Sequence, residues 1–136
     1  MTGWKLPAFG VFVAWGLWSF VPKLTVRYID PRSAAIFEGL GTLIVAFGLL
    51  WSMEWRPQSH PAGVALALST GMLGLLGALS FLVAVDRGPV SLVTMLSALY
   101  PALTVSLAVL FLGETITLRQ GCGMFLALVS MALIVG

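Results

Sequence analysis

Residues 99–121 read LYPALTVSLAVLFLGETITLRQG, an apolar run that holds a proline near its start and stops at a Gly-Glu pair. The charge-free window extends back beyond this stretch and covers residues 88–113. A helix needs roughly 20 apolar residues to cross the hydrocarbon core of a bilayer. The window therefore predicts one membrane-spanning helix that is bent at Pro101 and ends at Gly113 and Glu114.

Four further charge-free windows lie along the chain, over residues 6–22, 39–53, 61–85 and 120–136. The second extends back to Ser33 if Glu38 is allowed inside the span. Strands of a membrane barrel would alternate apolar and polar residues over about ten positions, and no window alternates in this way. We therefore predict an all-α membrane protein with one domain over residues 1–136, a bundle of five transmembrane helices. The helices are predicted at about residues 4–22, 33–53, 61–85, 89–112 and 117–136.

The composition agrees with a membrane protein and argues against several other classes. Hydrophobic residues make up 60% of the chain and charged residues only 9%, whereas soluble domains are about a quarter charged. The net charge of +2 comes from basic residues scattered singly between the windows, so we expect no nucleic-acid partner. His60 and Cys122 lack partners at metal-ligand spacing, and no nucleophile, base and orienting residue form a set. We expect no metal, no cofactor and no enzymatic activity.

Residues typical of helix ends separate the windows. Asp30 precedes Pro31 and is placed to cap the second helix. Thr117 and Gln120 have the spacing of a capping box, which would start the fifth helix. In the turn before it, Gly113 ends the fourth helix. Glu114 follows and can complement the amino end of the fifth helix, so we interpret this pair as a structural turn.

A polar stripe surrounds the proline of the fourth helix. At helical spacing Thr94, Ser97, Pro101 and Thr104 share one face, with Tyr100 beside it. Pro101 leaves a backbone carbonyl without its donor, and in a membrane such a group must be satisfied by protein or by a wet cavity. We predict that this face lines a substrate path. The alternative is a kinked packing face whose hydroxyls bond back to their own helix.

Two charged residues are candidates for a coupling site. Glu38 is the only acidic residue well inside a predicted span, and charge at that depth usually marks a functional site. We predict that it binds a proton or a cation. The alternative is an ion pair with Lys23, which lies on the same side of the membrane at the end of the first helix.

The tryptophans fall into two groups. Trp15 lies near the middle of the first span, where it offers a cation-π face to an amine substrate or fills the bundle, and packing is the more common role. We keep it among the candidate path-lining residues. Trp4, Trp51 and Trp55 fit the aromatic belt that gathers at membrane interfaces.

Three stretches resemble the EamA domain of the drug/metabolite transporter superfamily: AWGLWSFVPKL, DRGPVSLVTMLSALYPALTVSLAVLFLGETIT and LRQGCGMFLALVSMALI. The most specific feature is Leu-Tyr-Pro followed, twelve residues after Pro101, by Gly113 and Glu114; the Trp15-Gly16 pair with Lys23 seven residues on also falls in place. Larger members carry two five-helix units in tandem, inverted relative to each other. The resemblance implies a single unit here, an EamA-like half-transporter.

One position departs from the family pattern. Seven residues after the proline that begins the second helix, many EamA domains have an arginine, whereas this chain has Glu38. The substrate type of the two-unit members is therefore not transferred to this chain.

The basic residues give little bias in membrane orientation. Three lie on the N-terminal side, Lys5, Arg56 and Arg119, and four on the other, Lys23, Arg27, Arg32 and Arg87. Because the positive-inside rule needs a clear excess on one side, we expect dual topology and an antiparallel homodimer.

The expected function is that of a secondary transporter. It would move a small polar or amphipathic metabolite by alternating access, with proton coupling as a further option. Its partners would be the bilayer, the substrate and a second copy. We expect an integral multi-pass protein of a bacterial or archaeal plasma (inner) membrane. The alternative is a non-transporting membrane subunit that assembles with a different membrane protein.

Overall fold

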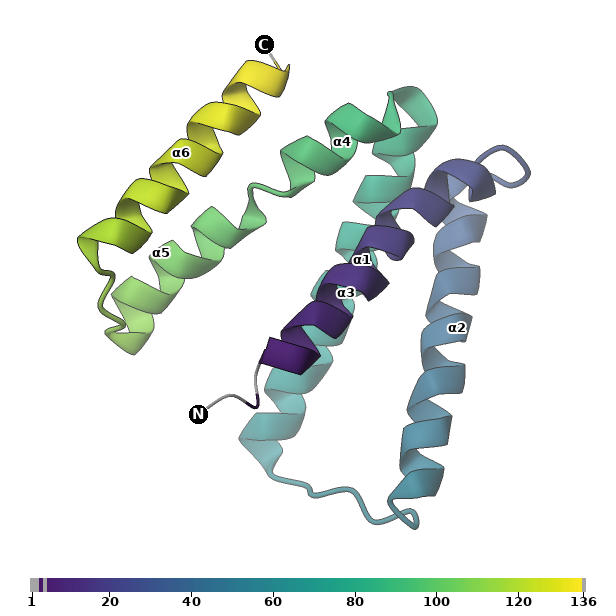
Figure 1. Cartoon of the computed structure of the whole chain (residues 1–136). Coiled ribbons are helices and arrows are strands. Elements are labelled where there is room, and N and C mark those ends of the chain that lie inside the picture. The colour runs from purple at the N-terminus through teal and green to yellow at the C-terminus, as the bar shows by residue number, and fades with distance from the viewer. Residues whose placement is uncertain (1–2, 4, 136) are drawn as a thin grey trace. The chain divides into compact units, whose positions relative to one another are not determined.

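The computed structural model describes residue 3 and residues 5–135, and all regular structure in that part of the chain is helical. The helices are α1 (Lys5–Thr25), α2 (Pro31–Ser52), α3 (Pro61–Arg87), α4 (Val90–Ser97), α5 (Tyr100–Leu112) and α6 (Leu118–Val135) (Figure 1). The predicted all-α fold with five apolar helical segments is confirmed, with α4 and α5 together forming the fourth segment. The predicted start of the first helix at residue 4 lies outside the described residues.

Four segments have the length and hydropathy of a membrane span: Leu6–Thr25, Pro31–Ser52, Pro61–Arg87 and Val90–Leu112. The apolar part of α6 is shorter and covers Leu118–Leu133. At 1.5 Å per residue the whole of α6, with 18 residues, extends roughly 27 Å, close to the thickness of about 30 Å of a hydrocarbon core.

Two helices run further than the charge-free windows predict. Helix α1 continues through Lys23 to Thr25, and α3 continues through Arg87. Each helix thus carries a basic residue in its last turn, where the carbonyl ends of the peptide dipoles favour positive charge. A charged residue ends an apolar window, but it does not end a helix.

The first structural unit comprises residues 1–87, and its buried core lies at one end. Helices α1 and α3 each approach this end with their C-termini, and α2 begins there. Ala34 and Ala35 at the start of α2 pack with Leu82 of α3. Half-buried Val26, Ile29 and Leu79 surround them. Small alanines on α2 allow the close approach of α3 that membrane helix packing requires.

Helix α2 begins and ends with specific local contacts. The Asp30 carboxylate accepts hydrogen bonds from the backbone N–H groups of Arg32 (2.9 Å) and Ser33 (3.1 Å), which confirms the predicted cap. The Ser33 hydroxyl also donates to it, and these hydrogen bonds lower the pKa of Asp30, because they favour the charged form.

After α2 the chain turns through two residues with positive φ, Glu54 (54°) and Trp55 (62°). The Trp55 ring packs edge-on against Phe47 at 5.3 Å and lies 6.4 Å from the Trp51 ring, which offsets the strain of this turn. Phe47, Trp51 and Trp55 therefore form one aromatic cluster, and the interfacial belt stays a prediction. Trp4 lies outside the described residues.

The second unit comprises residues 88–136, in which α4 contacts α6. Gly113 ends α5 in the left-handed conformation (φ 67°), which glycine adopts without strain. Thr117 and Gln120 form the predicted capping box: the Thr117 N–H donates to Gln120 Oε1 (2.9 Å) and the Gln120 N–H to Thr117 Oγ1 (3.4 Å). No side chain described in this unit is fully buried.

Candidate functional site

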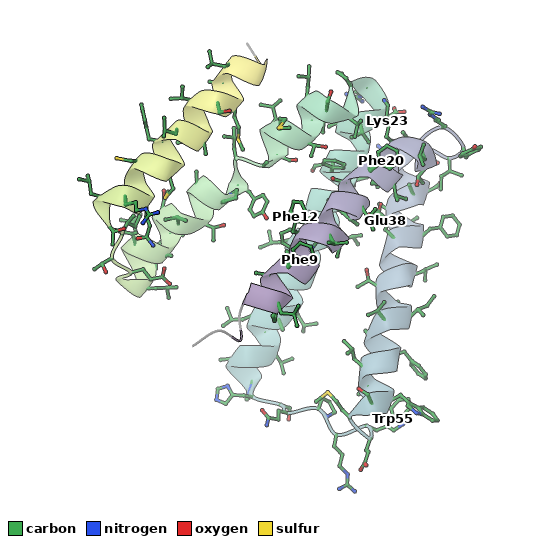
Figure 2. All side chains as sticks on the ribbon, in the orientation of Figure 1. Phe9, Phe12, Phe20, Lys23, Glu38 and Trp55 are labelled. Carbon is green, nitrogen blue, oxygen red and sulfur yellow. The ribbon has the colours of Figure 1, made fainter. Side chains whose placement is uncertain are left out.

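The carboxyl group of Glu38 lies at the edge of the apolar core of the first unit. Glu38 is seven residues after Pro31 and so lies roughly 10 Å along α2. The buried Ala34 and Ala35 lie about one turn before it, and the next residue, Gly39, faces Leu75 of α3. Figure 2 shows Glu38 and Lys23 toward the same end of the unit.

One oxygen of this carboxyl group, Glu38 Oε2, is inaccessible to solvent and has no hydrogen-bond partner among the described residues. Buried side-chain oxygens in native proteins are nearly always paired, so an unpaired one requires an explanation. An unpaired carboxylate in an apolar environment is costly, and the group lowers this cost by binding a proton or a cation. The surroundings of Glu38 therefore suit the coupling role predicted for it.

Lys23 contacts the backbone of α3. Its Nζ donates a hydrogen bond to the carbonyl oxygen of Val85, a residue with no solvent exposure. The structure thus shows the Lys23 ammonium on a helix carbonyl. The ion pair between Lys23 and Glu38 stays a prediction.

The two tryptophans of α1 differ in their surroundings. Trp15 has 55% of its surface exposed, whereas the ring of Trp18 packs against Phe81 with 5.3 Å between ring centres. Phe81 is one of the buried residues of α3. Sequence reasoning did not single out Trp18, because its partner lies on a helix far along the chain. Its place four residues before Pro22, about one helical turn, was the local signal available in the sequence.

The polar stripe around Pro101 spans a break between two helices. Helix α4 ends at Ser97 and α5 begins at Tyr100, so the helix predicted over residues 89–112 is divided. Around the break the Leu99 N–H donates to Leu96 O (3.2 Å) and the Ala102 N–H to Leu99 O (3.0 Å), both three-residue turns. Pro101 has no N–H with which to continue the α-helical pattern.

The hydroxyls of the stripe bond to their own helices. Ser97 Oγ donates to Thr94 O (2.9 Å) and Thr104 Oγ1 to Tyr100 O (3.2 Å). This is the arrangement expected for a packing face. Each hydroxyl oxygen still has lone pairs with which to accept a hydrogen bond from a substrate or from water. The path-lining role of Thr94, Ser97, Pro101 and Thr104 stays a prediction.

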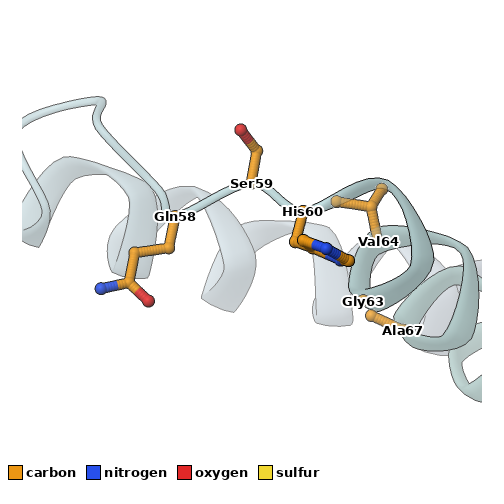
Figure 3. Close-up of a pocket in the computed structure, with 6 residues that line it drawn as sticks. All are labelled: Gln58, Ser59, His60, Gly63, Val64 and Ala67. Carbon is orange, nitrogen blue, oxygen red and sulfur yellow. The ribbon is translucent and has the colours of Figure 1, made fainter.

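Other polar groups of the described chain do not form a site. Three or more His, Cys, Asp or Glu side chains do not come together anywhere in residues 3 and 5–135. A hollow at the start of α3 is lined by Gln58, Ser59, His60, Gly63, Val64 and Ala67 (Figure 3). All six residues are exposed, so this hollow is wide and open to its surroundings.

Apolar helices long enough to span a bilayer indicate an integral, multi-pass membrane protein. The chain matches the EamA-like transporter family over residues 3–136 and belongs to that family. The resemblance found in the sequence is thereby confirmed.

Two curated relatives differ in length. An uncharacterized protein of Methanocaldococcus jannaschii is 38% identical over 124 residues, which cover 91% of this chain and 90% of that protein. The chloroplastic phosphoenolpyruvate/phosphate translocator 2 of Arabidopsis thaliana is 31% identical over 121 residues, which cover 85% of this chain and 32% of the translocator. The chain thus spans about a third of the longer relative. No solved structure matches the chain significantly.

Proposed function

We propose that the protein is a secondary transporter that moves a small polar or amphipathic metabolite by alternating access, as an antiparallel homodimer. Membership of the EamA-like transporter family supports the transport role. The comparison of lengths supports assembly from more than one copy, because the chain corresponds to only 32% of the Arabidopsis translocator. Transporter sites commonly form between two inverted repeats, and a second, inverted copy would supply the repeat that one unit lacks.

The observation that carries the coupling part of the proposal is the unpaired Glu38 Oε2. A carboxyl group with an inaccessible oxygen is stable in the apolar span when it holds a proton and costly when it is empty and charged. Exchange of this proton for a substrate or a cation would link transport to the pH gradient. Glu38 is thus the proposed coupling residue.

The sign of the charge at Glu38 also bears on the substrate. The Arabidopsis relative is named a phosphoenolpyruvate/phosphate translocator, and its named substrates are anions. Once Glu38 has released its proton in the exchange step, its carboxylate repels an anion that approaches it closely. We therefore propose neutral or cationic metabolites as substrates, with phosphoenolpyruvate and phosphate as the comparison compounds.

The test is uptake into proteoliposomes under an imposed pH gradient. Radiolabelled phosphoenolpyruvate, inorganic phosphate and a panel of primary amines and neutral amino acids are assayed with the wild-type protein and with Glu38→Gln. Glu54→Gln is the matched control, because Glu54 lies in the turn after α2. The proposal expects Glu38→Gln to lose the pH-dependent part of uptake and Glu54→Gln to keep it.

Two results would count against the proposal. Equal pH dependence in the wild type and in Glu38→Gln would remove Glu38 from the coupling role. Absence of flux for every compound, together with co-purification of a different membrane protein, would favour the non-transporting subunit.

A further inference from the structure

The buried carbonyl of Val85 lies in the last turn of α3, where helix carbonyls have no intrahelical donor. Within an α-helix the carbonyl of residue i accepts from the N–H of residue i+4. For Val85 that residue is Pro89, which lies beyond the end of α3 at Arg87, has an extended backbone and has no N–H. Val85 has no solvent exposure, so water cannot take the place of the missing donor. An unpaired buried acceptor of this kind is destabilising.

The Lys23 side chain of α1 supplies this donor. Its Nζ donates to Val85 O across 62 positions of the sequence. Lys23 lies in the last turn of α1, and Val85 lies in the last turn of α3. The carbonyl ends of two helices therefore meet one positive charge, which stabilises both C-termini.

This contact lies at the packed end of the first unit. Pro22, directly before Lys23, is fully buried, as are Leu82 and Val85. Away from this end the described residues 6–18 of α1, 40–49 of α2 and 61–77 of α3 are all exposed. The three helices of the unit are thus held together mainly where Lys23 binds Val85.

We propose that Lys23 is a positioning residue: its ammonium caps the Val85 carbonyl at the end of α3 and fixes the C-terminus of α1 to that of α3. Lys23 acts on transport through this contact and does not touch the substrate. The transport part of this inference rests on the proposed function. The structural part does not, because it concerns only the folding of the unit.

Substitution of Lys23 tests the structural part. Lys23→Met keeps most of the length of the side chain and removes its donor, while Lys23→Arg keeps a charged donor at the end of the side chain. Unfolding by sodium dodecyl sulfate in mixed micelles is measured for the wild type and for both variants. Arg87→Met is the matched control, because Arg87 is an exposed basic residue at the same end.

The expected result is a loss of stability that depends on the donor at residue 23. Lys23→Met should raise the ratio of unfolded to folded protein roughly tenfold. Lys23→Arg retains a donor and should remain close to the wild type, as should Arg87→Met.

Equal effects of Lys23→Met and Arg87→Met, or an equal loss of stability in Lys23→Met and Lys23→Arg, would overturn the proposal. If Lys23→Met does not fold at all, Lys23→Arg decides: its folding supports the proposal and its failure to fold overturns it. In the uptake assay, Lys23→Arg should transport like the wild type. Loss of uptake in a stable Lys23→Arg variant would show that Lys23 contacts the substrate, against a positioning role. Without measurable flux in the wild type, the unfolding measurements still decide the contact.

Discussion

Truncation of Leu82 to alanine tests whether the one-ended core holds the first unit together. Leu82 has 0% of its surface exposed and packs against Ala34 and Ala35 of α2. Leu-to-Ala changes at such positions cost about 2–5 kcal/mol in soluble proteins. In a bilayer the cost of the truncation comes mainly from the lost packing contacts of Leu82. The transfer of the side chain out of water contributes less, because lipid chains are as apolar as leucine. We therefore expect the lower end of the range, about 2 kcal/mol, or roughly thirtyfold in the folding equilibrium.

The assay is reversible unfolding in mixed micelles, followed by helical circular dichroism and by tryptophan fluorescence. Trp18, stacked on Phe81 next to Leu82, should report the change directly. Leu76→Ala is the control, because Leu76 lies on the same helix and is 61% exposed. The control should change stability by less than about 0.5 kcal/mol. Equal effects at the two positions, or no effect at Leu82, would refute the one-ended core.

Three further predictions concern helix ends and the helix break. Gly113→Ala should destabilise the folded protein by about 1 kcal/mol, because the φ of 67° strains any residue with a Cβ. Gly48→Ala is the control in the same unfolding assay, because Gly48 lies in the interior of α2 with no atom within 4 Å of the added Cβ. This control should not lose stability. Because hydrogen bonds from Ser33 lower the pKa of Asp30, its stabilising contribution is present above the pKa of the unfolded chain and is lost as the pH falls through the lower folded pKa. Acid titration of unfolding should show this loss in the wild type, and Asp30→Asn should lack it; an unchanged acid profile would contradict the role of the cap. Pro101→Ala should join α4 and α5 into one helix, seen as increased amide hydrogen-exchange protection at residues 98–101. Unchanged protection would show that Pro101 does not cause the break.

Much of the fold could be predicted from the sequence because a bilayer penalises charge so strongly. Charge-free windows located the five apolar segments, and the Asp30-Pro31 and Thr117-Gln120 pairs located two helix starts. The ends of α1 and α3 were placed too early, since Lys23 and Arg87 belong to the last helical turns. Local rules of this kind fix the segments along the chain.

Long-range contacts could not be predicted in the same way. The hydrogen bond from Lys23 to Val85 forms only when α1 and α3 bring their C-termini together. No local sequence pattern predicts this approach of the two helices. Glu38 was found from its charge and depth, but its unpaired oxygen depends on the packing around it. The division of the fourth segment was missed because a proline is compatible with either a kink or a break.

The central claim, an antiparallel pair of identical units, is tested most directly by membrane topology. Cys122, the single cysteine, is replaced by alanine, and Ser59→Cys places one exposed cysteine between α2 and α3. A membrane-impermeant maleimide is then applied to intact cells and to inverted vesicles. The account predicts comparable labelling of Ser59→Cys from both sides. Labelling from one side only would contradict it.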